Sequence, residues 1–395
     1  MAVPFTKLPL TASTKPSPFS IAISDEQLSD FKTLVKLSKI APQTYENLLA
    51  DGRYGVTHDW MTTMKEEWLN SYDWRATEKH ANSFPQYTTE IEGLTIHFAA
   101  LFSEKPDAIP IVLLHGWPGS YFEFLPILQF FKSQYSPSTL PYHLIVPSLP
   151  GYAFSSGPPL DRNFTNADSA RIIDQLMRDL GFGSGYVSQG GDIGSMIARL
   201  LGVKYESCKV NMCGLREPPE NVDDASTTDL ENRALERWDT FLYSGKAYAY
   251  EHGSRPATIG HVLSSSPLAL LAWVGEKLLQ WSDAPLSKTT VLDLITLYWF
   301  TESFPRAIYP YRENNPIPRH PTPAITKELY LHKPMGFSWF PKEIMPIPRS
   351  WIEKTGNLVH FKQHTEGGHF AALERPKDIK EDLDEFLAKA WPGFS

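Results

Sequence analysis

The sequence contains little cysteine. Only Cys208 and Cys213 occur in 395 residues, both within the segment CKVNMC. If this segment is a strand, side chains five positions apart point to opposite faces and cannot pair within it. We therefore expect small core residues of a reduced protein and no disulfide framework. Paired CxxC and HExxH motifs are also lacking, so we predict neither a metal site nor a cofactor.

Long apolar runs are also missing. The first residues, MAVPFTKLPLTASTKPSPFS, lack the continuous apolar segment of a signal peptide. No stretch of about 18 apolar residues follows anywhere in the chain. These absences lead us to expect a cytoplasmic protein that makes no contact with a membrane.

Blocks of like charge are absent as well. The net charge of −8 is spread along the chain without long acidic blocks. We therefore expect no nucleic-acid partner. Hydrophobic residues make up 42% of the chain and aromatic residues 13%, enough for a substantial core.

The pattern along the chain predicts a mostly parallel sheet with helices on both faces. Residues 1–85 form an N-terminal extension with helical periodicity, in which Ser24 is the expected N-cap of the first long helix. Strand-like and helical segments then alternate over 86–215. A helical, aromatic-rich insertion covers 216–320, and 321–395 return to strands and a last helix.

The segment GYVSQGGDIGS enters a sharp turn from a strand and leaves into a helix. A nucleophile on such a turn needs small neighbours, which Gly190, Gly191 and Gly194 supply. Many hydrolases carry serine here, but no G-x-S-x-G occurs and the turn carries Asp192. The helix N-terminus favours an ionised carboxylate. An ordinary N-cap aspartate is the alternative interpretation.

A second motif, HGWPGS, directly follows the buried run IPIVLL. His115, Gly116 and Pro118 define a turn that can aim backbone N–H groups at the end of the neighbouring strand. The N–H groups of Trp117 and Ile193 are therefore candidates for an oxyanion hole. Loop glycines without a role in catalysis are the alternative.

A candidate base lies near the end of the chain in HTEGGHF. His369 is preferred over His364 because Gly367 and Gly368 allow the loop to turn it inward. An acid between Asp192 and the histidine should orient the imidazole.

Glu343 follows a predicted strand and is the preferred orienting acid. Asp283 and Glu353 are alternatives that spacing alone does not decide between.

Together these motifs resemble the epoxide hydrolases of the α/β-hydrolase fold. The resemblance is to the microsomal-type branch, in particular its soluble fungal, Aspergillus-like members, and it covers nearly the whole chain. The matching segments are PFSIAISDEQLSDFKTLVKL, YDWRATEKHANSFPQYTTEIEGLTIHF, LLHGWPGS, VPSLPGYAFSSGPP, GGDIGS, SRPATIGHVLSSSPLALLAWVGEK and GGHFAALERP.

The resemblance implies roles for individual residues. It implies that Asp192 is the nucleophile, His369 the base and Glu343 the orienting acid. The fungal enzymes commonly have aspartate at this last position, whereas the membrane-bound mammalian members have glutamate. It also implies two cap tyrosines that polarise the epoxide oxygen.

These tyrosines match Tyr248 and Tyr311. Tyr250 and Tyr309 stand close by in the sequence and could be confused with them. The residues around 216–320 would then form a helical cap.

The activity implied is hydrolysis of an epoxide to a vicinal diol through a covalent aspartyl ester, with water as second substrate. The resemblance also implies a homodimer. The aromatic content of the cap favours aryl or bulky apolar epoxides. A haloalkane dehalogenase-like hydrolase, which also uses an aspartate nucleophile, is the main alternative, and a non-catalytic ligand-binding member of the fold is a second.

Overall fold

A nine-stranded sheet forms the centre of the molecule, and its strand order is β1-β2-β3-β5-β4-β6-β7-β8-β9. The computed structural model describes residues 3–213, 227–314 and 327–394. The strands are β1 (Ser17–Phe19), β2 (Gln86–Ile91), β3 (Leu94–Leu101), β4 (Ile109–Leu114), β5 (Tyr142–Pro147), β6 (Tyr186–Gly190), β7 (Cys208–Cys213), β8 (Leu331–Trp339) and β9 (Gly356–Gln363). The pairs from β1 to β5 are antiparallel, and those from β5 to β9 are parallel.

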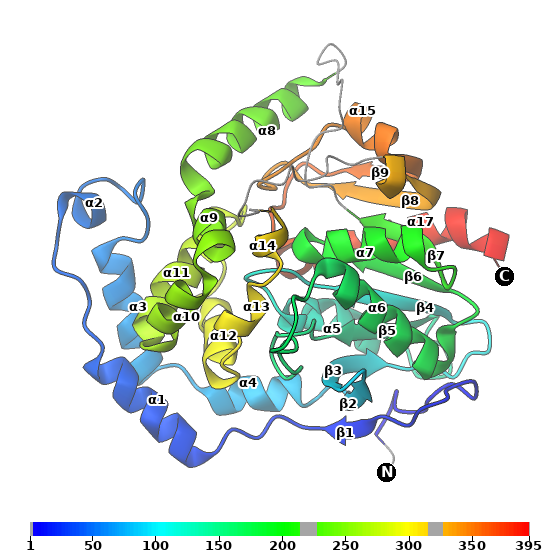
Figure 1. The fold of residues 1–395 in the computed structure, drawn as a ribbon, viewed down its shortest axis with the longest axis horizontal. Coiled ribbons are helices and arrows are strands. Elements are labelled where there is room, and N and C mark those ends of the chain that lie inside the picture. Colours follow the sequence, from blue (N-terminus) through cyan, green and yellow to red (C-terminus); the bar gives the residue numbers. More distant parts are fainter. Residues whose placement is uncertain (1–2, 214–226, 315–326, 395) are drawn as a thin grey trace.

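Helices cover both faces of this sheet, as the alternating pattern predicted (Figure 1). They are α5 (Leu125–Gln134), α6 (Asn166–Met177), α7 (Asp192–Lys204), α15 (Arg349–Ile352), α16 (Ala371–Glu374) and α17 (Pro376–Ala390). Helix α6 packs beside α7, and α5 packs beside α17. Strand β4 is buried on both sides, which explains its run of apolar residues without polar alternation.

The N-terminal extension contributes β1 and four helices, α1 (Asp25–Leu37), α2 (Tyr45–Leu48), α3 (His58–Asn70) and α4 (Trp74–Ala81). Helix α1 begins with a capping box, in which Ser24 accepts a hydrogen bond from the Gln27 N–H and the Gln27 side chain accepts one from the Ser24 N–H. The N-cap predicted at Ser24 is therefore confirmed. Figure 1 shows α1 and α3 along one side of the insertion helices.

The described residues of the insertion between β7 and β8, which we call the cap, form mainly helices. They are α8 (Asp229–Thr240), α9 (Ala247–Ser254), α10 (Pro256–Ser264), α11 (Pro267–Gln280), α12 (Lys288–Phe300), α13 (Phe304–Ala307) and α14 (Tyr311–Asn314). Proline occupies the first turn of α10 and α11, where its missing N–H leaves no bond unmade. Ser266 and Ser287 cap α11 and α12.

Polar contacts and close packing fasten the N-terminal extension to the cap. The buried Trp68 donates from Nε1 to Thr296 Oγ1 at 2.9 Å. Tyr72 donates to Asp293 Oδ1, also at 2.9 Å. A Cβ on Gly275 would lie 2.4 Å from the Trp60 ring, so α3 and α11 pack at that glycine.

Over residues 3–213, 227–314 and 327–394, no single helix is long and apolar enough to cross a membrane. Helices α10 and α11 meet the length and composition requirements only when taken together, and a bend of 118° separates them.

Candidate active site

Asp192 stands on the tight turn between β6 and α7. Its φ angle is +49°, a left-handed conformation that is rare for a residue with a side chain. A Cβ on Gly190 would lie 2.3 Å from the Gly194 carbonyl oxygen, and one on Gly194 would lie 2.2 Å from the Leu114 carbonyl oxygen. Gly191 has no neighbouring atom within 4 Å of the corresponding position. Gly194 is thus required by the close approach of the turn to β4, and Gly190 by its close approach to the first turn of α7.

The Asp192 side chain does not act as an ordinary helix cap. Gly191 is the N-cap of α7, and no side-chain capping bond is formed there. Oδ1 of Asp192 instead accepts a hydrogen bond from the Trp117 N–H at 2.9 Å. The approach is so close that a Cβ on Gly116 would lie 2.4 Å from Oδ1.

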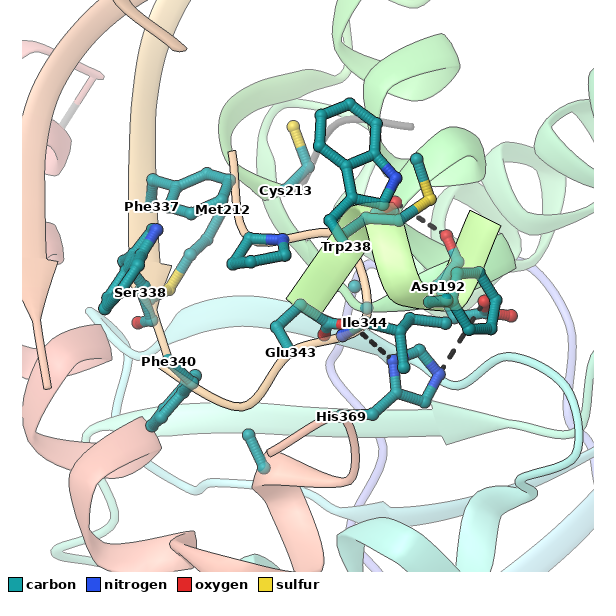
Figure 2. Close-up of a pocket in the computed structure, with 18 of the residues that line it drawn as sticks. Asp192, Met212, Cys213, Trp238, Phe337, Ser338, Phe340, Glu343, Ile344 and His369 are labelled. Atoms are coloured by element: carbon teal, nitrogen blue, oxygen red, sulfur yellow. Dashed lines mark hydrogen bonds and ion pairs between the residues drawn. The ribbon is translucent and has the colours of Figure 1, made fainter. Parts of the chain in front are cut away.

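His369 lies between two carboxylates (Figure 2). Its Nε2 is 3.8 Å from Oδ2 of Asp192, and its Nδ1 is 2.6 Å from Oε1 of Glu343. Gly367 has a φ of +110° and lets the loop after β9 turn inward. The His369 N–H donates to the Trp281 carbonyl of the cap at 2.9 Å, which fixes the loop beneath the cap.

The alternative residues are engaged elsewhere. His364 pairs with the buried Asp382 at 2.7 Å and stacks on a phenylalanine.

Asp283 accepts a hydrogen bond from the Gly367 N–H at 2.8 Å, so it supports the histidine loop without contacting the imidazole. Glu353 pairs with the exposed Arg349. The structure therefore brings together Asp192, His369 and Glu343, as the sequence predicts.

The charges in this cluster depend on one another. Burial would lower the pKa of His369, but the Glu343 carboxylate and the Asp192 charge outweigh it and raise the pKa to about 9. Burial raises the pKa of Glu343, but the His369 charge and hydrogen bonds from His369 and the backbone leave it below its ordinary value. With Nδ1 donating to Glu343, the Nε2 atom of His369 faces Asp192 and is the position at which a proton can be exchanged.

The HGWPGS turn at the end of β4 is held by its histidine. Nε2 of His115 accepts a hydrogen bond from the Leu149 N–H at 3.1 Å, and burial lowers the pKa of His115 to about 4. This neutral side chain supports the turn and stays outside the chemistry.

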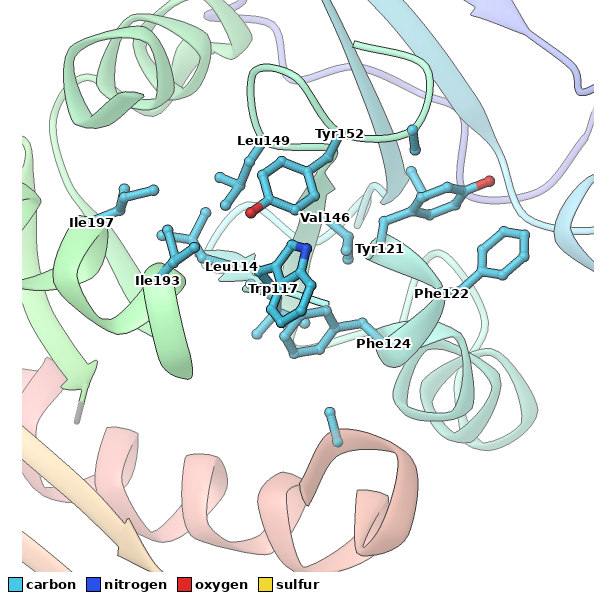
Figure 3. Packing of buried hydrophobic residues seen from close by; sticks show 14 of the residues in the cluster. Leu114, Trp117, Tyr121, Phe122, Phe124, Val146, Leu149, Tyr152, Ile193 and Ile197 are labelled. Carbon is cyan, nitrogen blue, oxygen red and sulfur yellow. The ribbon is translucent and has the colours of Figure 1, made fainter. Parts of the chain in front are cut away.

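Figure 3 shows Trp117 and Ile193 on either side of the end of β4. The Ile193 N–H belongs to the first turn of α7, where helical N–H groups have no acceptor within the helix.

Two buried tyrosines, Tyr248 on α9 and Tyr311 at the start of α14, line the same cavity as Asp192. Their ring centroids are 5.7 Å apart, and both rings pack against Trp117. Of the two residues that could be confused with them, Tyr250 is 55% exposed. Tyr309 shares a hydrogen bond with Ser169 at 2.7 Å. The structure places the expected pair at the cavity and the alternatives away from it.

The cavity above Asp192 has a volume of about 480 Å³, within the range of small-molecule sites. Its walls are largely apolar and come from the cap and from the ends of β7 and β8. Apart from the residues already described, they include Met212, Cys213, Trp238, Phe241, Leu242, Phe337, Trp339, Phe340, Ile344 and Met345. Among the described residues, no group of three or more histidine, cysteine, aspartate or glutamate side chains could hold a metal ion.

Glu123 also lies at the site, although the sequence motifs did not identify it. It lies in the short 3-10 helix η1 (Tyr121–Phe124), and only 9% of it is exposed. Together with Asp192 and His369 it lines a second, smaller cavity. The sequence pattern that could have drawn attention to Glu123 is Ser120-x-x-Glu123, a capping box directly after the HGWPGS turn.

Comparison with known proteins identifies relatives along the whole chain. A family model described as "Epoxide hydrolase N terminus" matches residues 16–124, and one described as "alpha/beta hydrolase fold" matches residues 109–254. The structure of Aspergillus niger epoxide hydrolase is similar with a TM-score of 0.94 and 61% identity, covering 98% of this chain and 100% of that one. Epoxide hydrolase 1 of Sus scrofa is 30% identical over 94% of this chain and 88% of its own length. The juvenile hormone epoxide hydrolase of Bombyx mori, at 24% identity and a TM-score of 0.83 over 95% of this chain and 96% of that one, shares the fold.

Proposed function

The chain belongs to the epoxide hydrolases of the α/β-hydrolase fold and is an epoxide hydrolase, and we propose that it forms vicinal diols through an ester on Asp192. The observation that carries this proposal is the geometry around Asp192. Oδ1 is held by the Trp117 N–H, while Oδ2 lies 3.8 Å from Nε2 of His369. A carboxylate in this position can attack through one oxygen while the other is already held by a backbone donor.

In the first half of the reaction, Oδ2 of Asp192 attacks an epoxide carbon and the ring C–O bond breaks. Tyr248 and Tyr311 hydrogen-bond the ring oxygen, and one of them gives its proton to the emerging alkoxide. Such acid catalysis typically contributes about 10²–10⁴-fold to the rate. The product of this half-reaction is an ester between Asp192 and the substrate.

In the second half, Nε2 of His369 removes a proton from water, and the water oxygen attacks Cγ of the Asp192 ester. The N–H groups of Trp117 and Ile193 bind the oxyanion that develops on Oδ1, each worth about 3 kcal/mol of barrier. When the C–O bond to the substrate breaks, His369 returns the proton to the leaving oxygen. The second proton of the water restores the tyrosine, so the sum is epoxide plus water to diol.

The dehalogenase alternative requires N–H donors around a departing halide. The residue that follows the nucleophile, Ile193, has no side-chain donor, and the tyrosine hydroxyl groups suit an oxygen leaving group. We therefore keep epoxide opening as the proposal for the chemistry at Asp192.

The apolar cavity of about 480 Å³ favours aryl or bulky apolar epoxides. A homodimer remains a prediction from the resemblance to the family, and a cytoplasmic location remains a prediction from the sequence. Sedimentation analysis of the purified chain would test the first, and its distribution between cell fractions would test the second.

Substitution His369→Gln tests the covalent route, because it removes the base and leaves the nucleophile. Mixed with styrene oxide, this variant should gain the mass of one epoxide molecule on Asp192, measured by intact-protein and peptide mass spectrometry. His364→Gln, in the same loop but paired with Asp382, is the matched control and should turn over without accumulating the adduct. If the adduct is missing in His369→Gln, or present after Asp192→Ala, the proposal is wrong.

A further inference from the structure

A second cavity, of about 60 Å³, adjoins the catalytic pair. Its walls include Asp192 and His369, which also line the larger cavity, together with Glu123 from η1 and the HGWPGS turn. A water molecule needs on the order of 10–15 Å³ and two or more polar partners. This cavity meets both conditions, at the carboxylate that would carry the ester.

The Glu123 carboxyl group is directed by its surroundings. A Cβ on Gly119 would lie 1.2 Å from Oε1 of Glu123. The carboxyl group therefore packs against the Gly119 backbone, in space that any other residue would fill with its side chain. The Ser120 N–H donates to the same Oε1 at 3.1 Å. Tyr298 of α12 donates to the Gly119 carbonyl at 2.9 Å and holds this turn from the cap.

Capping alone does not account for Glu123. Glu231 occupies the same capping-box position in α8 and accepts hydrogen bonds from the Thr228 N–H, the Thr228 hydroxyl and the Arg349 N–H. Glu123 accepts only the one from Ser120, and no residue within the described part of the chain donates to its Oε2. A buried carboxyl group with one neutral donor is costly unless a further polar partner is present. The cavity provides the room for that partner.

Resting on the proposed function, we infer that Glu123 and Nε2 of His369 together bind the water that hydrolyses the Asp192 ester. The water donates one hydrogen to His369 and the other to the Glu123 carboxyl group. Its lone pair is thereby aimed at Cγ of Asp192.

Electrostatics agrees with this assignment. Burial and the Asp192 charge raise the pKa of Glu123 to about 8, while the His369 charge and the Ser120 hydrogen bond oppose the rise. The charged groups that face Glu123 are thus Asp192 and His369. In either protonation state the Glu123 carboxyl group keeps an oxygen that can accept a hydrogen bond from the water.

The substitution Glu123→Gln separates this role from capping. The amide oxygen of glutamine still accepts from Ser120, since glutamine also completes a capping box, so the melting temperature should stay near that of the unchanged enzyme. In rapid-quench single turnovers with styrene oxide, ester formation should stay within about threefold. Ester hydrolysis should slow by roughly 10- to 100-fold, the cost of a misplaced reactant. The matched control is Glu231→Gln, a buried capping-box glutamate outside both cavities, which should leave both rates unchanged.

The inference is overturned if Glu123→Gln slows neither step, or slows both equally. Glu123→Asp is the second variant, because its shorter side chain withdraws the carboxylate from the cavity while keeping the charge. It should show the same selective loss. Absence of any ester in the unchanged enzyme and in His369→Gln would instead refute the proposed function, so the two failures are distinguishable.

Discussion

At the scale of single residues, the site links the charge of Asp192 to the basicity of His369. In the free enzyme the Asp192 charge helps to raise the pKa of His369, so the imidazole carries a proton near neutral pH. Formation of the ester removes that charge. The pKa of His369 then falls, and the imidazole releases its Nε2 proton to solvent and can act as a base. It regains that proton from solvent when ester hydrolysis restores the Asp192 charge.

We predict that the rate constant of ester hydrolysis rises with pH. Only the neutral imidazole can accept the water proton, so the rate should fall about tenfold per pH unit below the pKa of His369. Because the ester lacks the Asp192 charge, the midpoint should lie below the value of about 9 in the free enzyme. Stopped-flow decay of the ester after a pH jump measures this midpoint.

A control variant checks the origin of the midpoint. Glu343→Gln removes the largest influence that raises the pKa of His369, so the midpoint should move to lower pH. A hydrolysis rate that is independent of pH, or that falls as pH rises, would contradict this assignment of the base.

At the scale of secondary-structure elements, the turn from β6 to α7 is compressed against the end of β4. On this turn Asp192 has a positive φ, and its side chain lies within reach of the Trp117 N–H. The site therefore depends on backbone-to-backbone distances that only glycine permits at two positions.

Two glycine variants test this compression. Gly194→Ala should lower the free energy of unfolding by about 1–3 kcal/mol, because its Cβ would lie 2.2 Å from the Leu114 carbonyl oxygen. Gly191→Ala is the matched control, with no atom within 4 Å, and should change that free energy by about 0.5 kcal/mol or less. Urea unfolding measures both. Equal losses would show that the turn is not compressed as described.

The sequence predicts these elements because their signals are local. The buried run Ile109–Leu114 and the cap at Ser24 need no knowledge of distant residues. Tyr248 and Tyr250 are two residues apart and lie on different faces of a helix. Choosing between them from periodicity requires the phase of that helix, which the sequence does not give. A π-helical turn, Phe241–Gly245, precedes α9, so the helical phase does not carry over from α8.

At the scale of the whole molecule, the active site is assembled from segments far apart in the sequence. Asp192, Glu343 and His369 come from three separate loops at the ends of the parallel strands. The tyrosines come from the cap, which is fastened to the N-terminal extension through Trp68 and Thr296. The relative positions of these parts determine the chemistry.

The whole-molecule arrangement also sets the limit of prediction from sequence. The order of nucleophile, acid and histidine could be predicted, and Glu343 was preferred as the acid, but spacing alone did not decide between it and Asp283 or Glu353. Glu123 was not identified from the sequence, because its neighbours His369 and Asp192 in the smaller cavity are remote in the sequence. Its surroundings are formed only when η1, α7 and the histidine loop meet.

The central claim is the ester on Asp192, and a single turnover in ¹⁸O-labelled water tests it most directly. Excess enzyme is mixed with styrene oxide, and the diol and the peptide containing Asp192 are analysed by mass spectrometry. Because water attacks Cγ of the ester, we predict that the label enters the Asp192 carboxylate and that the first diol carries almost none. Label in the first diol, with none in Asp192, would show direct attack of water on the epoxide and contradict the covalent mechanism.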